Sequence, residues 1–156
     1  MKVSNLLMRD MILFDLNGRK REAVLNEMVA FLKKKQKAAK EKELFDKLIK
    51  REELGSTAIG NGVAIPHCKS KAVKQSLVLL AISREGVDFK AMDGKPAHLF
   101  FLVVSPPENP SLNLQILAAI AHLVRKSKNL IPEILKANNQ AEVMDVIAEE
   151  EEKLNE

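Results

Sequence analysis

The chain contains three histidines, and the setting of His67 is the most suggestive of chemistry. His67 follows Pro66 and ends a glycine-rich segment that includes Gly60 and Gly62. Proline fixes φ and removes a backbone donor, while glycine lets the main chain approach a ligand closely. A neutral imidazole is abundant at physiological pH and nucleophilic, so it can attack phosphorus and form a labile phosphoryl adduct. The local pattern allows a functional His67, with a purely structural histidine as the alternative.

The other histidines and the single cysteine fit structural roles. His98 lies within a predicted strand, and His122 lies off the apolar stripe of a predicted helix. Cys68 adjoins His67, but neighbouring side chains of an extended chain point to opposite faces, so we do not expect the two to share a proton. We expect a buried or half-buried structural thiol. The sequence shows no metal-ligand constellation, Walker-type phosphate loop or dinucleotide-binding glycine pattern.

A phosphoryl group on His67 needs a matched positive partner, and Arg51 is the candidate. Phosphoryl transfer depends on positioning and charge stabilisation, and an arginine fork binds two phosphate oxygens at once. Arg51 lies three residues after Leu48, so we place it on the inward helical stripe shared with Leu44. Its stem can then follow apolar surface while the guanidinium reaches the domain edge. The alternative is a helix-end cation favoured by the helix dipole.

Apolar periodicity predicts the elements that position these side chains. Helical spacing over 24–32 and again over 44–49 indicates two helices, the second ending at Gly55, which suits the left-handed position past a helix end. Over 57–66 we expect short extended pieces joined by a tight turn at 60–62. The apolar runs Leu77–Ser83 and Ala97–Val104 predict strands that are covered on both faces.

The remaining segments complete the predicted architecture. Arg84–Lys95 has no long apolar run and predicts a loop or short hairpin. A long helix is expected from about Ser111, and Ile131–Ala137 and Gln140–Glu150 predict two more. For the long helix we expect one apolar stripe, formed by Leu114, Leu117, Ala118, Ala121 and Val124. Together these elements predict an α/β fold, a single domain of residues 1–156 (core about 3–148) with a central mixed β-sheet flanked by helices on both sides.

Composition restricts the class of protein further. Apolar residues make up 46% and charged residues 29% of the 156 residues, as in globular domains. No apolar run approaches the roughly 20 residues that span a bilayer, so we expect no direct membrane insertion. A single cysteine suits a reducing compartment, and we expect the protein to be cytoplasmic. The formal charge of +4 and the basic segment Lys33–Lys42 leave a nucleic-acid-associated domain as one alternative. A solvated helix face explains the lysines more simply, so we expect no nucleic-acid partner.

One long block of the sequence is recognisable. Residues Arg51–His67, which read REELGSTAIGNGVAIPH, closely resemble the IIA component of the fructose/mannitol class of the bacterial phosphotransferase system. That class includes stand-alone nitrogen-regulatory members. Ser4–Leu7, Gly94–Pro96 and Leu114–Ala118 follow in family order, so the resemblance covers nearly the whole chain.

The resemblance implies a specific function. His67 would accept a phosphoryl group from the histidine phosphocarrier protein, and Arg51 would hold the phosphoryl oxygens. The group would pass to a IIB component, or its presence would change binding to a regulatory protein. No cofactor or metal is expected. Because no IIB or membrane segment is fused to the chain, we favour the nitrogen-regulatory type over the sugar-transport type.

Asn113 departs from the family pattern. Relatives commonly have a second active-site histidine there, whereas an asparagine amide donates a hydrogen bond without adding charge. We expect Asn113 to support phosphotransfer less strongly than histidine would. The alternative is a non-catalytic sensor that binds partners through the face around His67.

Overall fold

The two apolar runs predicted as strands pair with each other at the centre of the fold, in a computed structural model that describes residues 1–155. β5 (Leu77–Val87) and β6 (Ala97–Ser105) are antiparallel, with Leu80 opposite Phe101. Their side chains are almost entirely buried along both faces. This burial explains why the two strands read as continuous apolar runs rather than as alternating ones.

Four short strands extend this pair into a mixed sheet. The strands are β1 (Ile12–Leu13), β2 (Ala58–Gly60), β3 (Val63–Ala64) and β4 (His67–Lys69). The order is β1-β5-β6-β3-β2, and β4 also pairs with β6. β1 is parallel to β5, β3 and β4 are parallel to β6, and β2 is antiparallel to β3. The predicted mixed sheet is therefore confirmed.

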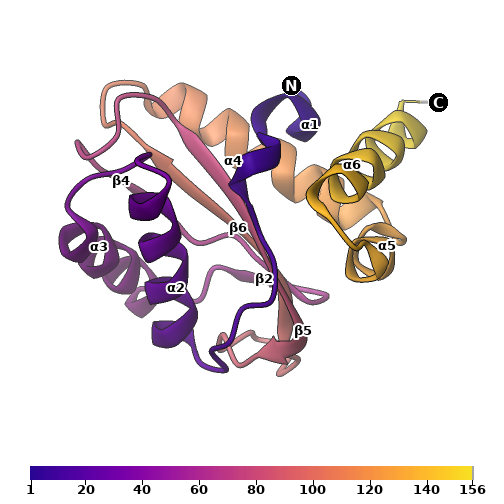
Figure 1. The fold of residues 1–156 in the computed structure, drawn as a ribbon, viewed down its shortest axis with the longest axis horizontal. Coiled ribbons are helices and arrows are strands. Elements are labelled where there is room, and N and C mark those ends of the chain that lie inside the picture. Colours follow the sequence, from indigo (N-terminus) through magenta and orange to yellow (C-terminus); the bar gives the residue numbers. More distant parts are fainter. Residues whose placement is uncertain (156) are drawn as a thin grey trace.

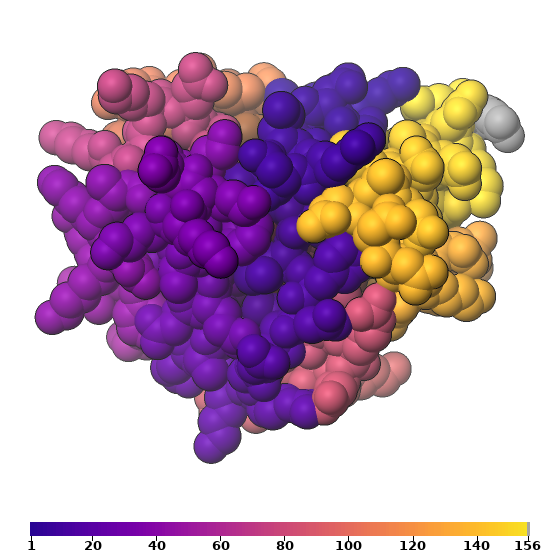
Figure 2. Space-filling view, in the orientation of Figure 1, coloured from indigo at the N-terminus to yellow at the C-terminus, as the bar shows by residue number. Residues whose placement is uncertain are grey.

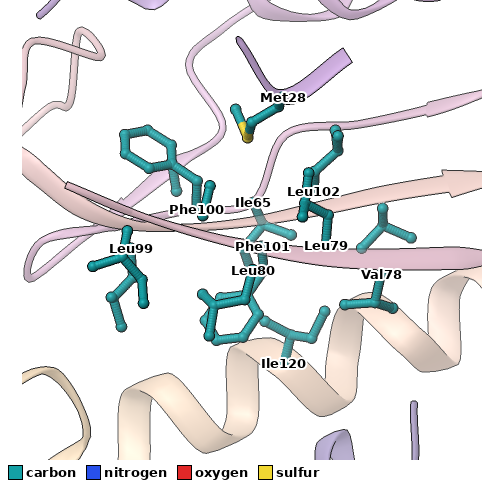
Figure 3. Packing of buried hydrophobic residues seen from close by; sticks show 14 of the residues in the cluster. Met28, Ile65, Val78, Leu79, Leu80, Leu99, Phe100, Phe101, Leu102 and Ile120 are labelled. Carbon is teal, nitrogen blue, oxygen red and sulfur yellow. The ribbon is translucent and has the colours of Figure 1, made fainter. Parts of the chain in front are cut away.

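Helices cover both faces of the sheet (Figure 1). On one face lie α2 (Arg21–Lys34) and α3 (Glu41–Glu53), and on the other lies α4 (Pro110–Lys126). Figure 3 shows Met28 of α2 and Ile120 of α4 packed on opposite sides of the two central strands. The α/β architecture expected from the sequence is confirmed.

The remaining helices lie near the beginning and the end of the described chain, which contact each other. They are α1 (Val3–Leu6), a single 3-10 turn (Arg9–Met11), α5 (Leu130–Lys136) and α6 (Gln140–Leu154). Figure 2 shows the yellow C-terminal helices directly beside the indigo N-terminal segment. The contact includes the Glu151 carboxylate, which accepts hydrogen bonds from Val3 N at 2.6 Å and Ser4 N at 2.9 Å. Glu151 thereby satisfies backbone donors at the start of α1.

Of the two forms predicted for Arg84–Lys95, a loop or a short hairpin, the structure has a hairpin, because β5 continues to Val87 before the chain turns back to β6. The register with β6 shifts between Ile82 and Val87. Within this stretch φ of Gly86 is 93°, and Ser83 Oγ accepts a hydrogen bond from Gly86 N at 3.0 Å. After this irregularity Val87 pairs with Ala97. A bulge of this kind lets a strand continue past a glycine that, in the sequence, signals a loop.

The basic segment Lys33–Lys42 forms the junction between two helices. α2 ends at Lys34 and α3 begins at Glu41, with positive φ at Gln36 and Lys40. Lys33 forms an ion pair with Glu41 at 3.5 Å. At least one lysine of the segment therefore serves the junction itself.

Candidate functional site

His67 is the first residue of β4, and its backbone pairs with that of β6. Val63 of β3 lies opposite Leu99, and His67, four residues on, lies opposite Val103, so the register continues unbroken across the gap between β3 and β4. The carbonyl of Pro66 accepts a hydrogen bond from Val103 N at 2.9 Å within that gap. The candidate nucleophile therefore lies on a strand that pairs directly with β6.

The ring of His67 has a defined tautomer. Its Nδ1 lies 2.8 Å from the carbonyl oxygen of Ile65. A carbonyl oxygen only accepts hydrogen bonds, so Nδ1 bears the proton and Nε2 keeps its lone pair in the neutral ring. Among residues 1–155, no group forms a hydrogen bond with Nε2. The half-buried ring thus presents a nucleophilic nitrogen whose orientation is set from its opposite side.

Arg51 lies in the last turn of α3 and lines the same cavity as His67. Its Nη1 donates to the carbonyl of Gly55 at 2.8 Å, just past the helix end. The side chain is half-buried. Arg51 therefore satisfies a carbonyl just beyond the helix end and also borders the cavity of His67.

Glu52, the neighbour of Arg51, links α3 to the glycine turn. Its carboxylate is 2% exposed and accepts hydrogen bonds from both the backbone N–H of Thr57, at 3.0 Å, and the Thr57 hydroxyl. The carbonyl of Thr57 in turn accepts from Ile65 N at 3.0 Å. This chain of contacts connects the helix that bears Arg51 to the residue whose carbonyl orients His67.

Asn113, in the first turn of α4, is the third residue of the site. It borders the cavity of His67 and is 6% exposed. Its Oδ1 accepts a hydrogen bond from the Ser105 hydroxyl at 2.8 Å. Within the described part of the chain, no acceptor pairs with its Nδ2. Asn113 therefore has a free donor at the wall of the cavity.

The cavity that joins these three residues has a volume of about 730 Å³. Besides Arg51, three further cations line it: Lys47, Lys50 and Lys69. Among residues 1–155, Glu53 is the single acidic residue of its lining. An excess of positive charge around a nucleophile suits a phosphate-bearing ligand.

The rim of this cavity is apolar and exposed. Leu54 is 85% exposed and Leu114 is 66% exposed, and the half-buried Leu117 lies one turn of α4 beyond Leu114. Exposed leucines around a concave site are typical of a protein-docking surface. The cavity thus combines charged and polar lining residues with exposed leucines.

The apolar stripe predicted for α4 is wrong. Its buried residues are Asn113, Ile116, Ile120, Leu123 and Val124, whereas Leu114, Leu117, Ala118 and Ala121 are exposed or half-buried. The helix carries apolar residues on more than one side, and its inward side begins with a polar residue. Only Val124 of the predicted stripe is buried.

Cys68 is half-buried in β4 and also lines the cavity. Burial raises the pKa of its thiol to about 12, and the positive charge of Lys47 opposes this only in part. Within residues 1–155, no hydrogen bond joins it to His67. The thiol stays protonated at physiological pH and is a poor nucleophile.

The other histidines lie outside this cavity. His98 Nδ1 is 2.9 Å from the carbonyl oxygen of Ser83, so it is a satisfied strand histidine. His122 is exposed on α4. In the described residues no cluster of three or more potential metal ligands occurs, and no helix there is long and apolar enough to cross a membrane.

Sequence reasoning missed Glu52, Leu54 and Ser105. Glu52 had a usable signal, because it lies four residues after Leu48 and therefore on the buried side of α3. For Leu54 and Ser105 we find no signal in the sequence. An exposed leucine and a serine at a strand end are both common features.

Comparison with known proteins gives one consistent family. Residues 5–150 match the family model described as "Phosphoenolpyruvate-dependent sugar phosphotransferase system, EIIA 2". A nitrogen regulatory protein of Bradyrhizobium diazoefficiens is 34% identical over 149 residues, which are 92% of each chain.

A second relative is much longer than this chain. The fructose-specific EIIABC component of Bacillus subtilis is 30% identical over 147 residues, which are 94% of this chain but 23% of that protein. Among solved structures, the nitrogen regulatory protein IIA-Ntr of Neisseria meningitidis superposes with a TM-score of 0.84 at 28% identity, covering 93% of this chain and 98% of that one.

Proposed function

The chain belongs to the EIIA 2 family of the phosphoenolpyruvate-dependent sugar phosphotransferase system, and from this premise we propose that Nε2 of His67 accepts and passes on a phosphoryl group. The observation that supports this most directly is the hydrogen bond from Nδ1 to the Ile65 carbonyl. It leaves Nε2 as the nitrogen with a lone pair, in a cavity that also contains Arg51 and Asn113.

The transfer balances as an exchange of one phosphorus–nitrogen bond for another. The Nε2 lone pair attacks phosphorus while the bond to the donor's histidine nitrogen breaks, and the donor ring keeps that electron pair. The proton on Nδ1 of His67 stays in place, so the phosphorylated ring becomes positively charged. The Ile65 carbonyl, 2.8 Å from Nδ1, stabilises that charge. Passing the group onward reverses these steps.

Two side chains bind the phosphoryl oxygens in this proposal. Arg51 uses the guanidinium nitrogens that are not committed to Gly55, and Asn113 donates from its free Nδ2. The lysines of the lining raise the local concentration of an anionic partner. No cofactor or metal takes part.

For partners, we propose the histidine phosphocarrier protein as donor and a IIB component or a regulatory protein as acceptor, in the cytoplasm. A IIB acceptor is supported by the Bacillus subtilis relative, whose name combines the A, B and C components. We favour the nitrogen-regulatory type, because the Bradyrhizobium relative matches over 92% of both chains and the Neisseria structure has a TM-score of 0.84. Rapid transfer to a fructose-type IIB protein would instead support the sugar-transport type.

The test is phosphorylation by the complete donor chain. The protein is incubated with phosphoenolpyruvate, Enzyme I and the histidine phosphocarrier protein, and its intact mass is measured. We expect one acid-labile phosphoryl group that is absent in His67→Ala and retained in His98→Ala and His122→Ala. An adduct that survives in His67→Ala would contradict the assignment of the acceptor.

A second function is favoured by one observation, the uncharged Asn113 at the wall of the cavity. A sensor that binds partners without being phosphorylated needs the apolar rim but no second charge. No adduct with the protein donor or with phosphoramidate, a small histidine-phosphorylating reagent, would favour the sensor.

A further inference from the structure

Two serine hydroxyls lie behind Asn113, on the side away from the cavity of His67. The Ser105 hydroxyl is 2.8 Å from Asn113 Oδ1, and the Ser76 hydroxyl is 3.2 Å from the Ser105 hydroxyl. Ser105 is fully buried at the end of β6, and Ser76 is half-buried before β5. The three polar groups form one continuous chain of hydrogen bonds.

The backbone holds the middle of this chain in place. The carbonyl of Ser105 accepts from Ser70 N at 2.9 Å, which continues the pairing between β4 and β6 beyond Lys69. Asn113 N is 3.3 Å from the carbonyl of Asn109, in the first turn of α4. Backbone hydrogen bonds therefore hold both the strand end that bears Ser105 and the helix start that bears Asn113.

The direction of these hydrogen bonds decides what Asn113 presents to the cavity. An amide has one accepting end and one donating end, and they are similar in shape. If Ser105 donates to Oδ1, the NH₂ group is left for the cavity. If the amide were reversed, its oxygen would face the cavity and repel a phosphoryl dianion.

Ser76 favours the direction in which Ser105 donates to Asn113 Oδ1. When its hydroxyl donates to Ser105 Oγ, the proton of Ser105 remains for Asn113 Oδ1. Ser76 also lines a second cavity of about 880 Å³, between the segment 71–76 and the start of α4. The Ser76 hydroxyl oxygen can accept a hydrogen bond from water there, which satisfies the outer end of the chain of hydrogen bonds.

We propose that Ser105, oriented by Ser76, is a positioning residue that holds the Asn113 amide with its NH₂ group toward a phosphoryl group on His67. This inference rests on the proposed function. Its consequence is that an uncharged residue acts as a defined hydrogen-bond donor at the place where relatives are expected to have a histidine.

The test compares rates of His67 phosphorylation by phosphoramidate, which needs no protein docking. Ser105→Ala should lower the rate by roughly 3- to 10-fold, the range of one neutral hydrogen bond. Ser76→Ala should lower it by about 2- to 3-fold, since it acts one bond further away. Ser83→Ala is the matched control, a buried serine of the same sheet whose hydroxyl accepts from Gly86, and its rate should not change.

A double-mutant cycle separates positioning from general disruption. In an Asn113→Ala background, Ser105→Ala should cause no further loss, because its effect passes through the missing amide. Asn113→Asp should be slower than Asn113→Ala, since a carboxylate oxygen would then face the phosphoryl group. The side-chain NH₂ resonances of Asn113 in NMR spectra should shift in Ser105→Ala and stay unchanged in Ser83→Ala.

The outcomes are distinguishable. Three results would overturn the positioning role while leaving the phosphocarrier function intact. They are a wild-type rate in Ser105→Ala, an equal loss from Ser105→Ala in the wild-type and Asn113→Ala backgrounds, and unshifted Asn113 resonances. If the wild-type protein forms no His67 adduct with any donor, the proposed function fails and this inference fails with it. Should Ser105→Ala not fold, the half-buried Ser76→Ala provides the same comparison.

Discussion

Replacing Arg51 tests the charge that the site supplies. Nη1 is already bonded to the Gly55 carbonyl at 2.8 Å, so in the proposed function the phosphoryl group uses the remaining guanidinium donors. A hydrogen bond to a charged group contributes about 1.5–3 kcal/mol, so Arg51→Ala should slow phosphorylation of His67 by roughly 10- to 150-fold. Arg51→Lys keeps the charge but loses the planar fork, and we expect roughly a 10-fold loss. The bond to Gly55 is exposed, so unfolding free energy should fall by less than about 1 kcal/mol in either variant.

The assay measures the initial rate of adduct formation by intact mass, with phosphoramidate and with the histidine phosphocarrier protein. Lys50→Ala is the matched control, because Lys50 adjoins Arg51 in α3 and lines the same cavity without a fork. It should change the phosphoramidate rate by less than about 3-fold at physiological ionic strength. An Arg51→Ala rate within two-fold of wild type, in a protein with unchanged thermal stability, would refute the proposed role.

Three further predictions concern stability, docking and thiol reactivity. Glu151→Ala removes two charge-assisted hydrogen bonds to α1. It should lower the unfolding free energy by about 2–4 kcal/mol, measured as a drop of roughly 5–12 °C in Tm. Glu151→Gln should lose less stability than Glu151→Ala. Leu114→Ser should slow transfer from the protein donor by roughly 5- to 10-fold, because the side chain is 66% exposed on the rim. The rate with phosphoramidate should stay within about two-fold of wild type. Equal losses with both donors would contradict a docking role for Leu114. Burial raises the pKa of Cys68 from 9.0 to about 12, so its alkylation by iodoacetamide near pH 8 should run roughly 1,000-fold more slowly in the folded protein than in urea. Rapid alkylation of the folded protein would show that the thiol is less buried than described.

The two central strands and most helices were predictable from their apolar patterns, whereas the short strands β1 and β4 were not predicted. The apolar runs that became β5 and β6 fit strands covered on both faces, and Gly55 was recognised as a helix end. The inward face of α4 was not predictable in the same way, since Leu114 and Leu117 define one apolar stripe and Ile116 and Ile120 define another. Spacing alone does not rank two apolar stripes of similar strength, and the sheet beneath the helix decides between them.

The candidate site was predictable in its residue types and less so in its geometry. His67 and Arg51 were selected by chemistry, and the structure brings both to one cavity. The tautomer of His67 depends on where the Ile65 carbonyl points, which follows from the register of β4 against β6. Ser105 and Asn113 face each other only because strand end and helix start meet across the turn. Such contacts between elements have no signature in local sequence.

The hydrogen bonds between Glu151 and the start of α1 also affect how the domain forms during synthesis. They join residues separated by 148 and 147 positions in the chain. A ribosome releases α1 long before residue 151 is made, so α1 at first lacks these partners. When α6 emerges, it closes the fold onto α1, and this part of the domain's stability is acquired late in the synthesis of residues 1–155. Until that moment, the start of α1 lacks the carboxylate that holds it in the native protein.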